Sequence, residues 1–128
     1  MDNYKSKICN SFSARAKSYD HFAKIQKVVN ERMIDRLDMI NYFPKTILDL
    51  GCGTGLLSNL LRKKYDNAKI ISVDFSFDML NACKEKKLNT SLLCADIEDL
   101  PMKSMSFDLI ISNFTLHWCQ NLQKILYN

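Results

Sequence analysis

The three glycines of this 128-residue chain all lie within ten residues, in the segment LDLGCGTGLL at positions 48–57. Average usage, about 7% glycine, would scatter more of them along the chain. Glycine adopts positive φ angles and lets other atoms approach the backbone closely, where a side chain would obstruct them. The apolar run TILDL at 46–50 precedes the glycines, and an apolar helical stripe starts at Leu56. This order predicts a buried strand, a tight turn that can hold a ligand, and a helix.

Short apolar runs alternate with helical stretches through the rest of the chain. Helices are predicted after the glycine turn and after Ser76, whose hydroxyl can cap a helix N-terminus. Strands that alternate with helices favour right-handed crossovers and a parallel sheet with helices on both faces. The fold class is therefore predicted as α/β. The four predicted strands cover residues 46–50, 69–74, 91–95 and 107–112.

The N-terminal part has a different pattern, because apolar residues recur there at steps of three and four through residues 11–43. Pro44 ends this helical region, since its ring and missing N–H do not fit a helix interior. No low-complexity tract or linker divides the chain. We therefore predict one domain over residues 1–128, with N-terminal helices at 1–43 and the α/β core at 44–128.

The C-terminal end, residues 120–128, has the pattern of the opening of a further helix. A sheet whose last strand contains the apolar run LIIS would leave backbone groups unpaired at its edge, and complete proteins usually cover such an edge. We therefore expect the chain to be a C-terminally truncated part of a larger fold, with its first four strands only.

The composition, with 47% hydrophobic and 25% charged residues, is that of an ordinary globular protein, and the net charge of +4 arises mainly from scattered lysines. We interpret the basic run at 62–64 as a solvated helix face, so neither nucleic acid nor a membrane is predicted as a partner. The five cysteines form no C-x-x-C pair and the two histidines do not match zinc-site spacings, so no metal site is predicted. The N-terminus lacks the apolar core of a signal peptide, and no apolar run reaches the roughly 18 residues of a membrane span. We expect a cytoplasmic protein with reduced, mostly buried thiols.

An acidic residue closes the second predicted strand, because Asp74 lies 23 residues after Gly51. At this separation a carboxylate can reach the ribose hydroxyls of an adenosine-containing cofactor bound at the glycine turn. A dinucleotide turn reads G-x-G-x-x-G, whereas this turn reads G-x-G-x-G and has Leu56 in place of the third glycine. Asp49 puts a negative charge beside the turn, which disfavours a pyrophosphate and favours an ammonium group. S-adenosylmethionine has both a cationic amino-acid end and an adenosine end, so it is the cofactor that fits best.

Four motifs follow one another along the chain, namely ILDLGCGTG, VDFSFDML, ADIEDLP and FDLIISNFTLHW. Over residues 46–118 they resemble the class I S-adenosylmethionine-dependent methyltransferases, which implies a Rossmann-like sheet that binds this cofactor. The N-terminal stretch FSARAKSYDHFAKIQ is similar to the leading helix of the malonyl-[acyl-carrier protein] O-methyltransferases of biotin synthesis. Related methyltransferases of ubiquinone precursors and small acids begin similarly, so the resemblance leaves the methyl acceptor open.

The resemblance also implies roles at the methionine end of the cofactor. Asp49 is expected to bind the ammonium group, directly or through water, while the backbone of the glycine turn passes the methionine part. Asn113, at the end of the fourth strand, is expected to border the methionine end and the acceptor. Tyr19 is expected to close over the transferred methyl group, with packing inside a helix as the alternative. The turn residues implied in this site are Gly51, Cys52, Gly53 and Gly55.

At the adenosine end, the resemblance implies that Asp74 accepts hydrogen bonds from both ribose hydroxyls and that Phe75 packs against the adenine. Asp96 and Ile97 are expected at the amino edge of the adenine. Each assignment has a structural alternative. Asp74 can cap a helix, Phe75 can lie in the core, and Asp96 can be a loop residue.

The predicted function is methyl transfer from S-adenosylmethionine to the free carboxylate of malonyl-acyl carrier protein, which makes an acyl carrier protein the implied partner. A carboxylate with a pKa of about 4 is ionised at neutral pH, so it needs no general base. We accordingly interpret His117 and Trp118 as structural and predict no catalytic residue. Another small acid or a quinone precursor is the alternative acceptor. A non-catalytic cofactor-binding fragment is the second alternative, because the last three strands of the family and its acceptor cover are missing.

Overall fold

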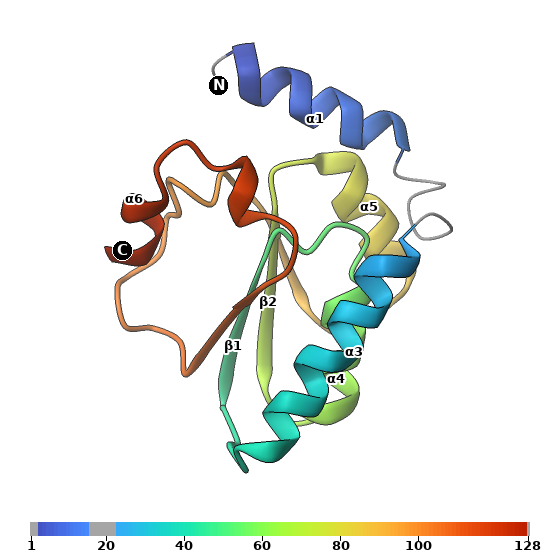
Figure 1. The fold of residues 1–128 in the computed structure, drawn as a ribbon, viewed down its shortest axis with the longest axis vertical. Coiled ribbons are helices and arrows are strands. Elements are labelled where there is room, and N and C mark those ends of the chain that lie inside the picture. The colour runs from blue at the N-terminus through green and yellow to red at the C-terminus, as the bar shows by residue number, and fades with distance from the viewer. Residues whose placement is uncertain (1–2, 16–22, 128) are drawn as a thin grey trace.

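The computed structural model describes residues 3–15 and 23–127 (Figure 1). Tyr19 lies outside the described residues, so its predicted place over the methyl group stays a prediction. Along the chain, the elements are α1 (Asn3–Arg15), α3 (Lys24–Met39), β1 (Thr46–Leu50), α4 (Leu56–Lys64), β2 (Lys69–Asp74), α5 (Phe77–Glu85), β3 (Ser91–Cys94), β4 (Leu109–Ser112), the 3-10 helix η1 (Leu116–Trp118) and α6 (Leu122–Tyr127).

The four strands form one parallel sheet in the order β3-β2-β1-β4, which confirms the predicted α/β fold. β1 and β2 have the predicted bounds, because both are apolar runs with a paired strand on each side. The two edge strands are shorter than predicted, since β3 ends at Cys94 and β4 begins at Leu109. The register places Leu50 beside Val73 and Ser112, so the carboxyl ends of β1, β2 and β4 meet at one edge.

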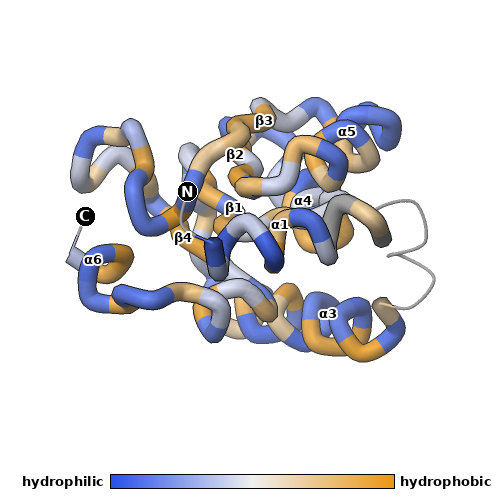
Figure 2. Tube along the Cα trace, turned by 90° about the horizontal axis from the view of Figure 1, so that it is seen from above, coloured by the Kyte–Doolittle hydropathy of each residue, from blue (hydrophilic) through white to orange (hydrophobic). Residues whose placement is uncertain are grey.

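One face of the sheet is covered by α3, α4 and α5 (Figures 1 and 2). The apolar stripe of α4 begins directly after the glycine turn and packs on β1 and β2, while α3 packs against α4. Buried apolar area on this face supplies the main driving force for the layer. The buried cluster consists of Ile47, Leu57, Leu61, Tyr65, Ala68, Ile70 and Ile111, and Met33, Ile34, Leu37 and Leu109 pack against it.

The opposite face is covered mainly by the irregular segment 95–108, together with η1 and α6 (orange to red in Figure 1). Helices were predicted on both faces, and the described part of this face has only these two short ones. Ile110 of β4 is 58% exposed, so the cover is incomplete near that edge strand. The buried members of this cluster are Leu48, Leu50, Val73 and Ile97.

Helix α1 lies across the carboxyl ends of the strands, at the top of Figure 1, and packs against α5. It begins at Asn3, eight residues before the apolar periodicity that predicted the N-terminal helices. The carboxyl edge of an open parallel sheet is where ligands bind in α/β folds, so the position of α1 makes it a wall of any site there.

The remaining residue classes place few constraints on the chemistry. All five cysteines are free thiols, but only Cys52 and Cys83 are buried. Within residues 3–15 and 23–127, no group of three His, Cys, Asp or Glu side chains could hold a metal ion. Among the described helices, none is both long enough and apolar enough to cross a membrane.

Candidate functional site

The glycine turn is fixed to the end of β2 by its own backbone. The amides of Gly51 and Cys52 both donate to the carbonyl oxygen of Val73, at 2.8 and 2.9 Å. The amide of Gly55 donates to the Cys52 oxygen at 2.9 Å, and Gly55 then serves as the N-cap of α4. All three glycines have positive φ angles, of 71°, 54° and 86° along the chain, which other L-residues adopt at a cost.

Two of the glycines are also required by close packing within the chain. A Cβ atom on Gly51 would lie 2.0 Å from Oγ1 of Thr115, in the segment after β4. A Cβ atom on Gly55 would lie 2.5 Å from Sγ of Cys83 in α5. The glycines are predicted to make room for a ligand, but at these two positions the chain's own side chains already require glycine.

Asp49 is the most deeply buried carboxylate of the site, with 1% of its surface exposed at the end of β1. The hydroxyl of Ser58 in α4 donates to Oδ2 of Asp49 at 2.6 Å, and Ser58 lies 2.8 Å from the hydroxyl of Ser72. Burial raises the pKa of Asp49 to about 7, and the nearby Asp74 carboxylate adds to this, whereas the Ser58 hydrogen bond opposes it. A cationic group placed beside Asp49 would restore the ionised form.

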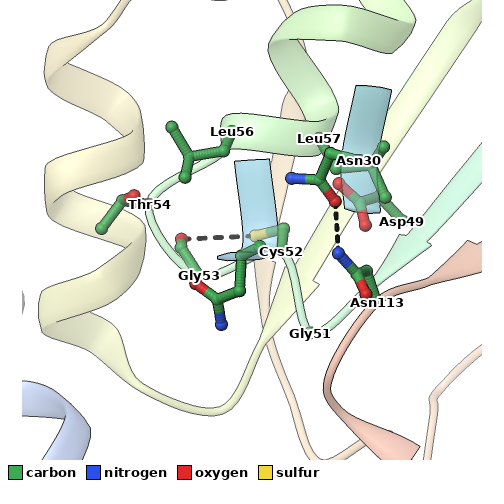
Figure 3. Close-up of a pocket in the computed structure, with 10 residues that line it drawn as sticks. Asn30, Asp49, Gly51, Cys52, Gly53, Thr54, Leu56, Leu57 and Asn113 are labelled. Atoms are coloured by element: carbon green, nitrogen blue, oxygen red, sulfur yellow. Dashed lines mark hydrogen bonds between the residues drawn. The ribbon is translucent and has the colours of Figure 1, made fainter. Parts of the chain in front are cut away.

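Asp49 lines a cavity between the glycine turn, α3 and the end of β4, which we call the turn cavity (Figure 3). Asn113 donates from Nδ2 to Oδ1 of Asn30, and Figure 3 shows the two amides facing each other beside Asp49. Asn30 is 4% exposed, so α3 contributes a buried polar side chain here. The lining residues are Gln26, Asn30, Asp49, Gly51, Cys52, Gly53, Thr54, Leu56, Leu57 and Asn113.

Asp74 connects the glycine turn to the start of α5. Its Oδ2 accepts from the amide of Gly53 at 2.8 Å, and its Oδ1 accepts from the amide of Ser76 at 2.9 Å. Burial raises the pKa of Asp74 although these amide hydrogen bonds oppose the shift. The cap of α5 is Ser76, whose hydroxyl accepts from the amide of Met79 at 3.4 Å, so Asp74 holds the segment before the helix and does not cap it. The cavity beside it, which we call the middle cavity, also touches Gly51, Gly53, Phe75, Met79, Asn113, Phe114, Thr115 and Trp118.

A third cavity lies under α1, and we call it the α1 cavity. Its walls are mostly apolar, and Trp118, which is 38% exposed, forms one of them. The ring of His117 lies 4.7 Å from the Trp118 ring, centre to centre, and His117 itself is exposed. The lining residues are Lys5, Ile8, Gly51, Phe75, Asp96, Ile97, Glu98, Thr115, Trp118 and Cys119.

The three cavities share walls. The turn cavity and the middle cavity share Gly51, Gly53 and Asn113, and the middle cavity and the α1 cavity share Gly51, Phe75, Thr115 and Trp118. The row therefore runs from Asp49 past Asp74 to Asp96. These three carboxylates lie at or just after the ends of β1, β2 and β3.

The structure brings most of the sequence-predicted residues to this row. The two exceptions are Gly55, whose α-carbon faces Cys83 of α5, and Tyr19, which lies outside the described residues. The predicted residues that line the row are Asp49, Gly51, Cys52, Gly53, Asp74, Phe75, Asp96, Ile97 and Asn113.

Sequence reasoning missed the residues that α1, α3 and the segment after β4 contribute. Asn30 carried a usable signal, because it precedes Met33, Ile34 and Leu37 at helical spacing and is the polar member of a buried stripe. Lys5 carried no such signal. The other missed residues of these segments are Ile8, Gln26, Phe114, Thr115, Trp118 and Cys119, and Glu98 was missed in the segment after β3.

Comparison with known proteins identifies this architecture. The family described as "Methyltransferase domain" matches residues 48–128. The malonyl-[acyl-carrier protein] O-methyltransferase of Methylovorus sp. strain MP688 is 36% identical over 94% of this chain, and that of Priestia megaterium is 40% identical over 95%. The matched parts are 44% and 45% of those proteins, so the chain spans less than half the length of these curated relatives.

Solved structures agree on the fold. An S-adenosylmethionine-dependent methyltransferase from Clostridium acetobutylicum superposes with a TM-score of 0.67 and 28% identity, over 84% of this chain and 50% of that one. A methyltransferase from Haloferax volcanii in complex with its Trm112 activator gives a TM-score of 0.75 at 21% identity, over 90% of this chain and 52% of that one. The sheet is therefore that of a Rossmann-like class I methyltransferase, and the chain belongs to the methyltransferase domain family.

Proposed function

We propose that the chain binds S-adenosylmethionine along the row of three cavities and that it provides the cofactor half of a carboxyl methyltransferase. The observation that carries this proposal is the row of carboxylates, Asp49, Asp74 and Asp96, at the carboxyl ends of three successive strands. The order of these carboxylates suits a ligand with a cation at one end, a ribose in the middle and an amino-substituted base at the other end.

The methionine end fits the turn cavity. The burial that raises the pKa of Asp49 leaves a carboxylate that gains most from a cationic partner, which the ammonium group of the cofactor would supply. Gly51, Cys52 and Gly53 expose backbone to the same cavity. Asn113 lines both this cavity and the middle one, so we assign it to the border between the methionine end and the acceptor.

The ribose fits the middle cavity. Asp74 uses one lone pair of each oxygen for the Gly53 and Ser76 amides, and a carboxylate offers about four lone-pair sites in all. Its remaining sites can accept from two ribose hydroxyls, which are donors. The same amide bonds hold the carboxylate still, which reduces the entropy lost on binding.

The adenine fits the α1 cavity. Ile8, Phe75, Ile97 and Trp118 offer apolar and aromatic surface for a flat ring, and Asp96 offers an acceptor for its amino group. Gly55, which caps α4, and Tyr19 complete the proposed set. We assign Gly55 to shaping the turn and Tyr19 to covering the methyl group.

When bound, S-adenosylmethionine supplies a methyl group on a sulfonium, which is an already activated leaving group. The residues of this chain therefore have mainly to align the reactants and exclude water. The relatives named above are malonyl-[acyl-carrier protein] O-methyltransferases, which supports a malonyl carboxylate as acceptor and an acyl carrier protein as partner. Such a carboxylate is ionised at neutral pH and needs no general base. Another small acid or a quinone precursor is the alternative acceptor.

A second candidate function is cofactor binding without catalysis. The chain spans less than half of its curated relatives, and the exposed Ile110 shows that the β4 side of the sheet lacks full cover. A chain of this kind can bind the cofactor without offering an acceptor site. The proposed location in the cytoplasm is common to both candidates.

Replacing Asp74 with alanine should weaken binding of S-adenosylhomocysteine by about 5- to 150-fold, which corresponds to roughly 1–3 kcal/mol for unpaired polar groups. Calorimetric titration of the 128-residue chain measures this. Asp78→Ala is the matched control, because Asp78 is an exposed carboxylate in the first turn of α5. Equal affinity of the Asp74→Ala and wild-type chains for S-adenosylhomocysteine would contradict the assigned ribose site. Absence of binding by a folded wild-type chain would contradict the cofactor proposal itself.

Methyl transfer separates the two candidate functions. The wild-type chain is incubated with S-adenosylmethionine and malonyl-acyl carrier protein, and mass spectrometry follows the acyl carrier protein. Addition of one methyl group supports the carboxyl methyltransferase. Saturable cofactor binding without methylation of this acceptor or of free small acids supports the non-catalytic candidate.

A further inference from the structure

Lys5 connects α1 to the polar rim of the α1 cavity. Its ammonium group lies 2.6 Å from Oδ2 of Asp96 and forms a second ion pair with Glu98. The side chains of Lys5 and Glu98 are 19% and 8% exposed, so solvent screens these pairs less than it screens surface pairs. Lys5 is 91 residues from Asp96 in sequence, and it lines the same cavity.

The two oxygens of Asp96 are both held. Oδ1 accepts from the amide of Glu98 at 3.0 Å, and Oδ2 accepts from Lys5. Burial raises the pKa of Asp96, but the Lys5 and Glu98 hydrogen bonds outweigh this and keep the pKa below its ordinary value. Asp96 is therefore an ionised, acceptor-only group in a fixed orientation.

Glu98 anchors the arrangement on its other side. Its Oε1 accepts from the amide of Asn121, at the start of α6, while Oε2 pairs with Lys5. The Lys5 ammonium is thus held by a buried carboxylate that is itself held by backbone. Asp96, with 37% of its side chain exposed, has the most freedom of the three side chains to turn toward water once Lys5 is removed.

We propose that Lys5 is a positioning residue that fixes Asp96 as the acceptor for the adenine amino group, and so makes the site selective for adenine over hypoxanthine. The inference rests on the proposed function. Hypoxanthine has a carbonyl oxygen where adenine has the amino group, and a fixed carboxylate repels this oxygen while it accepts from the amino group. A carboxylate that turns toward water discriminates less, because either base can then be hydrated.

The test compares S-adenosylhomocysteine with S-inosylhomocysteine as ligands of the full 128-residue chain, by calorimetric titration. The wild-type chain should prefer the adenosyl ligand by about tenfold or more. Lys5→Met should bind the adenosyl ligand more weakly and reduce the preference to about threefold or less. Lys5→Arg keeps a cation that can bridge two carboxylates and should keep the preference. Lys7→Met is the matched control, since Lys7 is exposed on the same helix.

The outcomes that would overturn the inference about Lys5 differ from the outcome that would overturn the proposed function. An unchanged preference in Lys5→Met overturns the inference, because a merely structural lysine would alter both affinities alike. Tighter adenosyl binding also overturns it, since Lys5 would then compete with the amino group for Asp96. Wild-type chain that binds neither ligand overturns the proposed function itself. If circular dichroism shows Lys5→Met unfolded, Lys5→Ala, which also removes both the charge and the donor, is judged by the same criteria.

Discussion

Replacing Gly51 with alanine is expected to lower the free energy of unfolding by about 3 kcal/mol. The φ angle of 71° at Gly51 costs an alanine about 1–2 kcal/mol. The new Cβ would lie 2.0 Å from Oγ1 of Thr115, and overpacking of this kind adds roughly 1–3 kcal/mol. Urea denaturation of the two chains measures the difference.

A double-mutant cycle separates the two causes. Thr115→Gly removes the three atoms nearest to the new Cβ, so Gly51→Ala should cost mainly the φ penalty of about 1–2 kcal/mol in that background. If Gly51→Ala costs the same with and without Thr115, the close approach is not what requires glycine. The cycle then leaves backbone conformation as the whole explanation.

The glycine turn shows what the sequence could and could not predict. The pattern placed the turn correctly, because a buried strand, glycines and an apolar helix follow one another locally. It could not give the reason for each glycine. Thr115 lies 64 residues from Gly51, and Cys83 approaches Gly55 from another helix, so only the folded chain brings these atoms together.

Strand prediction succeeded where the local pattern reflects burial on both sides. β1 and β2 are central strands, and their apolar runs end where the strands end. The N-terminal helices were harder to predict, because helical spacing alone does not say which face is buried. Ile25 belongs to the apolar series but is 74% exposed, whereas the polar Asn30 is buried beside Asn113.

The candidate site also contains residues that the sequence could predict and residues that it could not. Asp49, Asp74 and Asp96 follow strands, and residues after parallel strands converge at one edge, so their proximity could be predicted. Lys5 and Trp118 reach the site only because α1 and the segment after β4 fold over that edge. Sequence spacing contains no information on such long-range packing.

Replacing Asp49 with asparagine should stabilise the chain above pH 7 and at the same time weaken binding of S-adenosylhomocysteine by about 100-fold. The binding loss follows if the carboxylate holds the ammonium group, since a hydrogen bond between charged partners contributes roughly 1.5–3 kcal/mol. The gain in stability follows from the pKa of about 7. A shift of about three units above the ordinary value corresponds to an upper limit of about 4 kcal/mol for burying the charge.

The sign of the pH dependence is fixed by the direction of that shift. A raised pKa in the folded state means that the folded chain binds more protons than the unfolded chain between about pH 4 and pH 7. As the pH rises through this interval, the free energy of unfolding of the wild-type chain should therefore fall relative to that of Asp49→Asn. Below the interval the two free energies should be nearly equal, and above it they should differ by a constant amount. The difference between the two unfolding free energies removes contributions common to both chains. A difference that does not change with pH would show that Asp49 titrates normally, and equal ligand affinity would show that its carboxylate does not hold the ammonium group.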